Sequence, residues 1–146
     1  MGASGSGKST LARTLASSAA GVVVVSYDVH QAHVAGRPGC VVGDQALESA
    51  RERVAAHCAA GRTVIVDGTH SQRDRRVAIR AIAAAHRYVT AVVALRVPLA
   101  VCLERQASRA WPVPAADVTR QDAAITAALP DLAQEGHARV VQFSAP

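Results

Sequence analysis

The sequence predicts an α/β fold in which helices cover both faces of a doubly wound parallel sheet. A glycine-rich segment followed by a helical stretch opens the chain, and short β-branched runs then alternate with longer stretches of helical periodicity. Continuous β-branched runs are typical of parallel strands that are buried on both sides. The alternating order therefore predicts one doubly wound domain over residues 1–146.

The glycine-rich segment is a phosphate-binding loop. Residues 2–10 read GASGSGKST and match the pattern G-x-x-x-x-G-K-[ST] in full, so we expect a P-loop NTPase fold of the nucleotide-kinase type. In this motif backbone N–H groups surround a phosphate, Lys8 reaches the β- and γ-phosphates, and Ser9 places its hydroxyl on Mg²⁺. Lys8 is the only lysine among 16 basic residues, which favours a specific role over chance survival.

Length and composition limit the classes of function. A chain of 146 residues is long enough for one buried core, and with 3% aromatic residues that core must be aliphatic. The three cysteines are widely spaced and predict neither a disulfide framework nor a zinc site. No apolar run is long enough to span a bilayer, so we expect a cytoplasmic protein without a membrane partner. The net charge of +5 suits a polyanionic partner, or else reflects an arginine-rich coding bias.

Four buried strands are expected, at residues 21–26, 63–67, 89–97 and 139–143. Helices are expected between them, over residues 9–20, 44–61, about 71–86, 99–110 and 115–129, whereas residues 29–42 read as an irregular loop because glycine and proline interrupt them. The helix over residues 44–61 should bury Leu47, Ala50, Val54 and Cys58. The helix over about residues 71–86 should bury Val77, Ala81, Ile82 and Ala85.

Two carboxylates follow buried strands. Asp28 lies two residues after the run at 21–26, and Asp67 ends the run at 63–67. The carboxyl ends of parallel strands form the ligand-binding edge of an open α/β sheet. Phosphoryl transfer needs charge neutralisation, alignment and an acceptor for a proton. We interpret Asp28 as the general base rather than a turn cap, and Asp67 as a residue that holds Mg²⁺ through water rather than as a catalyst.

Several basic residues follow these carboxylates. Arg105 and Arg109 are four residues apart, which predicts one side of a helix that can close over the nucleotide and stabilise the transferring charge. An earlier helix carries four arginines that form either a track for a nucleic-acid backbone or merely a solvated face: Arg73, Arg75, Arg76 and Arg80. The histidines His30, His33 and His70 lack the further ligands that a metal site would need.

Taken together, these motifs resemble the kinase module of bacterial polynucleotide 5′-hydroxyl kinases, which also carry a phosphatase, and more widely the zeta-toxin-like AAA-type ATP-binding proteins. The resemblance covers nearly the whole chain and rests on residues 2–10, 26–28, 64–70, 101–109 and 134–141. It implies that Asp28 is the base on the 5′-hydroxyl and that Arg109 contacts the donor phosphates from a lid over about residues 99–118. Catalytic roles thus fall to Asp28, Lys8 and Arg109.

The expected ligands are ATP and Mg²⁺. Ser9 and, through water, Asp67 would hold the metal. The residues expected to bind the nucleotide are Gly2, Ser4, Gly5, Ser6, Gly7, Lys8, Ser9, Thr10, Arg105 and Arg109.

The chain departs from the family pattern at three places. Gln31 stands where the family has an arginine that clamps the phosphate beside the acceptor, and a neutral amide cannot make that bidentate contact. His70 replaces the asparagine of the motif D-x-T-N, although an imidazole can still donate a hydrogen bond. The central strand that precedes the loop in related kinases is missing, and we expect about five to eight mostly apolar residues upstream of Gly2.

Three functions remain open. The first is an ATP-dependent phosphotransferase whose hydroxyl acceptor is the 5′ end of a polynucleotide. The second is a kinase of the same architecture that acts on a small molecule such as a sugar, a nucleoside or an antibiotic; Gln31 and the scarcity of aromatic residues for base stacking favour it. The third is a non-catalytic nucleotide-binding module or a fragment of a longer kinase.

Overall fold

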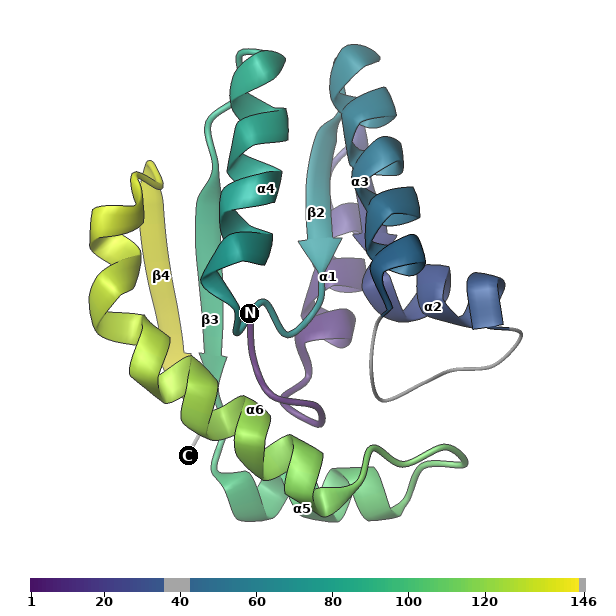
Figure 1. Cartoon of the computed structure of the whole chain (residues 1–146), viewed down its shortest axis with the longest axis vertical. Coiled ribbons are helices and arrows are strands. Elements are labelled where there is room, and N and C mark those ends of the chain that lie inside the picture. The colour runs from purple at the N-terminus through teal and green to yellow at the C-terminus, as the bar shows by residue number, and fades with distance from the viewer. Residues whose placement is uncertain (36–42, 145–146) are drawn as a thin grey trace.

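The computed structural model describes residues 1–35 and 43–144 (Figure 1). The elements follow in the order α1 (Lys8–Ser17), β1 (Val22–Ser26), α2 (Tyr27–Ala35), α3 (Asp44–Ala59), β2 (Thr63–Asp67), α4 (Arg73–Ala85), β3 (Ala91–Arg96), α5 (Leu99–Ala107), α6 (Ala115–Ala128), the 3₁₀ helix η1 (Leu129–Glu135) and β4 (Arg139–Ser144). This order confirms the predicted alternation of helices with short parallel strands.

The strands form two parallel pairs rather than one sheet. β1 pairs with β2 from Val22 opposite Thr63 to Ser26 opposite Asp67. β3 pairs with β4 from Ala91 opposite Arg139 to Arg96 opposite Ser144. Within the described residues no strand joins β2 to β3. In Figure 1 all four strands point the same way, with α1 behind the β1–β2 pair, α3 in front of it, and α5 and α6 across the carboxyl ends.

One predicted loop is partly a helix. Residues 27–35, most of which were expected to be irregular, form α2, which begins directly where β1 ends. The apolar periodicity of this helix is weak, so the sequence pattern did not reveal it. It is supported by packing on α3, where the His30 ring nitrogen Nδ1 lies 3.0 Å from the Ser49 hydroxyl. The rest of the predicted loop, including Cys40, lies outside the described residues.

Two hydrophobic clusters hold the fold together. One joins α3 to the β1–β2 pair and contains Val25, Tyr27 and the four predicted α3 residues Leu47, Ala50, Val54 and Cys58, whose burial is confirmed. The other joins the phosphate loop to α5 and α6 through Ala3, Cys102, Val118 and Ile125. The core is therefore aliphatic, as the composition predicted.

The inward face of α4 agrees with the prediction at Ile82 and differs from it at the other three positions. Val77 is 40% exposed, and Ala81 and Ala85 also face solvent. Arg76 and Ala83 are buried instead, and Ile79 and Ile82 pack against the first cluster. An arginine was not expected on an inward face because burying its charge is costly unless a partner compensates it, and such a partner proves to lie far along the chain.

None of the helices in the described part of the chain combines the length and the apolar character that crossing a bilayer requires.

The first cluster gives a direct test of this fold. Leu47 is 5% exposed and packs between α3 and the β1–β2 pair, so Leu47→Ala should lower the free energy of unfolding by about 2–5 kcal/mol. Urea denaturation measures the change. Val29→Ala on α2, where the side chain is 65% exposed, is the control and should change stability by less than about 0.5 kcal/mol. Equal losses in both variants would contradict the assigned core.

Candidate active site

The phosphate loop ends at the start of α1. Gly7 is the residue before the helix and has φ 88°, a left-handed conformation that side-chained residues adopt only at a cost. Because the first helical hydrogen bond runs from Leu11 N–H to the Gly7 carbonyl, the N–H groups of Lys8, Ser9 and Thr10 have no partner inside the helix. A Cβ at Gly7 would meet no atom within 4 Å. The loop thus presents free donors and open space, which fits a bound phosphate.

Gly5 brings the loop against α5. It has φ 94°, and a Cβ there would lie 2.5 Å from the carbonyl oxygen of Cys102 and 2.9 Å from its Cα. Arg105, one turn further along α5, donates from Nη1 to the Gly5 carbonyl at 3.2 Å. The predicted nucleotide-binding residue Arg105 therefore contacts the loop backbone directly, and only glycine fits at the contact point.

Gln121 of α6 is a contact of the loop that the sequence did not reveal. Its side-chain oxygen accepts a hydrogen bond from the Ser4 N–H at 2.9 Å. Ser4 and Ser6 are both buried in the loop, and the Ser6 N–H closes a turn onto the Ala3 carbonyl at 3.1 Å. No local pattern marks Gln121, because its partner is 117 residues away in the sequence.

Lys8, Asp28, Asp67 and Arg109 influence one another electrostatically. Lys8 donates from Nζ to the Ala3 carbonyl at 3.3 Å across the loop. Burial lowers the pKa of Lys8, and the nearby carboxylates of Asp28 and Asp67 oppose that shift. Partial burial raises the pKa of Asp28, which Lys8 counteracts and Asp67 reinforces, although the Asp28 side chain itself remains accessible to solvent. The structure thus brings the predicted base close to the predicted phosphate-binding lysine.

The predicted metal residues lie at the same edge. Asp67 is the last residue of β2 and is buried, and Ser9 lies in the first turn of α1. No group of three or more histidine, cysteine, aspartate or glutamate side chains that could hold a metal occurs among residues 1–35 and 43–144. Mg²⁺ in phosphate-transfer sites needs only one or two protein ligands, since substrate oxygens and waters complete its shell. Ser9 and Asp67 would suffice for a Mg²⁺ ion that is also bound by substrate oxygens and water. They would not suffice for a site made of protein ligands alone.

Arg109 occupies a different position from the one expected. α5 ends at Ala107, so Arg109 lies in the turn beyond the helix and does not share a regular helical face with Arg105. Its guanidinium lowers the pKa of Lys8 and of Asp28, so it is near both. The segment predicted as a lid, about residues 99–118, contains α5 and the first turn of α6, and its closure over a nucleotide stays a prediction.

A comparison with protein-family models finds that residues 1–128 match an AAA domain. The chain belongs to this AAA domain family. The family is P-loop NTPase-like and includes kinases, so nucleotide binding of a kinase-like kind is a property of the family. The match spans the phosphate loop, both carboxylates and the α5–α6 pair. It does not separate polynucleotide kinases or zeta-toxin-like proteins from other members, and a comparison with curated protein sequences finds no match.

In this AAA domain the turn after β2 supports the phosphate loop. The Gly2 N–H donates to the Thr69 carbonyl at 3.3 Å. His70 is buried at φ 50°, and its Nε2 lies 3.1 Å from the Val66 carbonyl, which can only accept, so this nitrogen carries the proton. The ring also packs on Tyr27 with centroids 4.9 Å apart. His70 does donate a hydrogen bond, as expected, but to the backbone beneath the site.

Arg76 fixes the same turn from below. Its Nη1 donates to the carbonyls of His70 and Ser71 at 2.8 and 3.1 Å, and its Nε donates to Glu135 at 2.8 Å. Both side chains of this ion pair are almost fully buried. His137 Nε2 lies 3.4 Å from the same carboxylate, and Arg73 lies 3.9 Å from it. Hydrogen bonding from Arg76 holds the pKa of Glu135 below its usual range.

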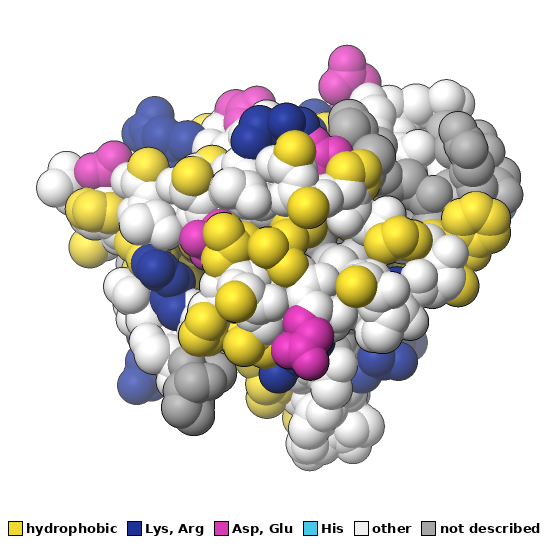
Figure 2. Space-filling view, turned by 90° about the horizontal axis from the view of Figure 1, so that it is seen from below, with side chains coloured by type: hydrophobic (Ala, Val, Ile, Leu, Met, Phe, Trp, Pro, Cys, Tyr) yellow, Lys and Arg dark blue, Asp and Glu magenta, His cyan; other side chains and the backbone are white. Residues whose placement is uncertain are grey.

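Arg76 therefore fits neither alternative for the α4 arginines, a nucleic-acid track or a solvated face, because it is buried and holds a turn in place. Arg80 lies beside Gly136, where a Cβ would approach its guanidinium to 2.7 Å. Figure 2 views the molecule from the side to which the strands point, and the Lys and Arg side chains described there lie in separate groups among hydrophobic and acidic ones. On this face the described residues form no continuous basic stripe.

The buried ion pair predicts a large loss of stability on removal of one partner. Arg76→Met should lower the free energy of unfolding by about 3–5 kcal/mol, because Glu135 would stay buried without its main compensating charge. Denaturant titration gives the value. Arg120→Met, which removes the exposed partner of Asp117, is the control and should cost less than about 1 kcal/mol. A loss below 1 kcal/mol for Arg76→Met would show that the pair contributes little.

His70 predicts a dependence of stability on pH. Burial lowers the pKa of His70 from 6.5 to about 3, so the unfolded chain binds a proton that the folded chain does not. The stabilising effect is complete above pH 6.5 and is lost as the pH falls towards 3. His70→Asn should flatten the fall by about 1.4 kcal/mol per pH unit near pH 5.

The same measurement distinguishes His70 from the other histidines. Burial also lowers the pKa values of His30 and His137, so both histidines make the free energy of unfolding fall as the pH falls. They do so equally in the wild type and in the variant. The difference between the two unfolding profiles therefore belongs to His70 alone. Parallel profiles over pH 5–6.5 would mean that the His70 ring takes up a proton in the folded chain.

Proposed function

We propose that this AAA domain is an ATP-dependent kinase that transfers the γ-phosphate of ATP to a hydroxyl group. The observation that carries the proposal is the placement of Asp28, which lies just beyond β1 at the edge where Asp67 ends the paired strand β2, and near enough to Lys8 that each charge acts on the pKa of the other. A loop that only binds a nucleotide has no need of a second carboxylate beside its lysine. A phosphotransferase has that need, because the attacking hydroxyl must lose a proton.

Each residue can be given a role on this proposal. The free N–H groups of Lys8, Ser9 and Thr10 and the Lys8 ammonium bind and orient the phosphates. Mg²⁺, held by Ser9 and through water by Asp67, neutralises phosphate charge when it is bound. Asp28 accepts the proton of the acceptor hydroxyl. Arg109 and Arg105 place positive charge over the loop from the α5 side, where Arg105 already contacts Gly5.

For the acceptor we propose the 5′-hydroxyl of a polynucleotide, on the strength of the sequence resemblance described above. The small-molecule alternative is favoured by one observation at Gln31. Its side-chain oxygen accepts a hydrogen bond from the Gly43 N–H at 2.9 Å, just before α3. The position that clamps a phosphate in polynucleotide kinases is here neutral and engaged with the backbone.

Asp28→Asn tests the catalytic proposal. The amide cannot accept the proton, so transfer should slow by roughly 10²–10⁴-fold while ATP affinity stays near that of the wild type. Transfer of label from ATP to a 5′-hydroxyl oligonucleotide, and to a panel of small alcohols, measures the rate. Partial burial raises the pKa of Asp28. As the pH is lowered, the transfer rate of the wild type should therefore begin to fall at a pH above the usual pKa range of a carboxyl group.

The control is Asp131→Asn, at an exposed position in η1 that lies outside the site. It should leave both transfer and ATP binding unchanged. Unaltered turnover in Asp28→Asn would support the non-catalytic module instead. Transfer to small alcohols but not to the oligonucleotide would keep the kinase and replace its acceptor.

A further inference from the structure

The loop between α5 and α6 carries an exposed indole. Trp111, the only tryptophan of the chain, is 68% exposed. Phe143, the next most exposed of the four phenylalanine, tyrosine and tryptophan residues, is 53% exposed. A single exposed apolar side chain is common on protein surfaces, so the meaning of this indole depends on how and where the loop holds it.

The backbone that carries Trp111 is fixed on both sides of it. Before it, the Arg109 N–H donates to the Gln106 carbonyl at 3.0 Å. After it, the Val113 N–H donates to the side-chain oxygen of Gln106, a buried residue, at 3.0 Å. Val113 also packs against the hydrophobic cluster that joins the phosphate loop to α5 and α6. The indole is therefore held in solvent by a preorganised loop, which lowers the entropy cost of a contact with a ligand.

This loop lies on the side of the molecule to which the strands point (Figure 1). α5 packs on the phosphate loop, where Arg105 donates to a loop carbonyl at 3.2 Å. Arg109, four residues further along, is near enough to Lys8 and Asp28 for its charge to act on both. Two residues of extended chain span at most about 7 Å, so the Trp111 backbone lies within that distance of Arg109. A cation suited to phosphate thus stands beside a flat apolar surface.

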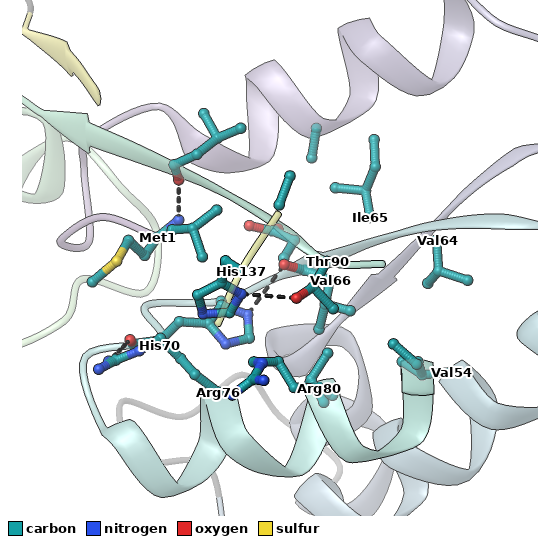
Figure 3. Close-up of a pocket in the computed structure, with 18 of the residues that line it drawn as sticks. Met1, Val54, Val64, Ile65, Val66, His70, Arg76, Arg80, Thr90 and His137 are labelled. Carbon is teal, nitrogen blue, oxygen red and sulfur yellow. Dashed lines mark hydrogen bonds between the residues drawn. The ribbon is translucent and has the colours of Figure 1, made fainter. Parts of the chain in front are cut away.

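Other rings around the phosphate loop are enclosed by the protein. Tyr27 is 2% exposed and packs on His70. Figure 3 shows His70 and His137 in the interior between β2 and β3, and each of these rings is hydrogen-bonded to another group of the chain. These three rings are engaged with the protein, whereas Trp111 keeps most of its surface free for a ligand.

We propose that the indole of Trp111 stacks on a nucleobase when substrate is bound. The ligand is a planar heterocyclic base joined to phosphate, supplied either by the adenine of ATP or by the terminal base of a polynucleotide acceptor. Stacking needs only a flat face, and a neighbouring arginine adds the charge that attracts the phosphates. The contact rests on the proposed function, because it gives the base of a substrate a place in the same site. One indole at this position is sufficient for one base, although the chain has few aromatic residues.

Tryptophan fluorescence tests this contact directly, because Trp111 is the only tryptophan. Four ligands are titrated into the full chain with Mg²⁺: ADP, inorganic tripolyphosphate, a 5′-hydroxyl oligonucleotide, and the same oligonucleotide with an abasic first residue. Quenching by ADP but not by tripolyphosphate would support stacking on adenine. Quenching by the oligonucleotide but not by its abasic form would support stacking on the acceptor base. Emission that changes equally with and without the base, or that changes with none of the four up to millimolar concentration, would overturn the proposal.

Substitutions at Trp111 separate stacking from support of the loop. Trp111→Leu keeps an apolar side chain without a ring, and Trp111→Phe keeps a smaller ring. The dissociation constant of the base-bearing ligand, measured by calorimetry, should rise roughly 5- to 150-fold in Trp111→Leu and less in Trp111→Phe. The dissociation constant of tripolyphosphate should stay unchanged. Phe143→Leu, at an exposed position in β4, is the control and should change neither constant. Equal weakening of both ligands in Trp111→Leu would overturn the proposal.

The result for the kinase is separate from the result for the indole. Base-dependent quenching without transfer of phosphate to any acceptor would keep the stacking contact and reject the proposed function. Transfer with emission that does not depend on the base would keep the function and reject the contact. An emission shift that follows protein concentration alone, with dimers in sedimentation, would assign Trp111 to a contact between two copies and would also overturn the proposal.

Discussion

The close approach of Gly5 to the first helix of the α5–α6 pair is the constraint on which the candidate site depends. No side chain fits between the Gly5 backbone and the Cys102 carbonyl, so the loop and α5 pack backbone to backbone. That contact places Arg105 within hydrogen-bonding distance of the loop, and it brings α6 near enough for Gln121 to bind Ser4. The glycines of the motif therefore do more than leave room for phosphate, because they also set the position of the helices that cover it.

The packing of the phosphate loop against α5 also affects how charged groups are arranged at the carboxyl edge of the β1–β2 pair. Lys8 is the focus, since the charges of Asp28, Asp67 and Arg109 all act on its pKa. Burial disfavours its charge and the carboxylates restore it, while the same burial raises the proton affinity of Asp28. The positive charge of Lys8 and the negative charge of Asp28 each favour the charged form of the other group.

Support for the loop comes from beneath through buried polar contacts. Thr69 holds Gly2, Arg76 holds the two residues after Thr69, and Glu135 holds Arg76. The C-terminal part of the chain thus stabilises the turn that contacts the start of the phosphate loop. On its other side Met1 is bonded to β3.

The phosphate loop, the four strands, the two carboxylates that follow them and the inward face of α3 were predictable from the sequence, because each depends on residues close together in the chain. The helix α2 was not, since its periodicity is weak and packing on α3 supports it. The inward face of α4 was predicted correctly only at Ile82, and the burial of Arg76 was missed because its charge is compensated by Glu135, 59 residues away. Gln121 went unnoticed for the same reason, with a partner 117 residues distant. Local pattern determined which residues form the phosphate loop, and only the tertiary structure decided what holds that loop in place, because its partners are distant in the sequence and meet through folding alone.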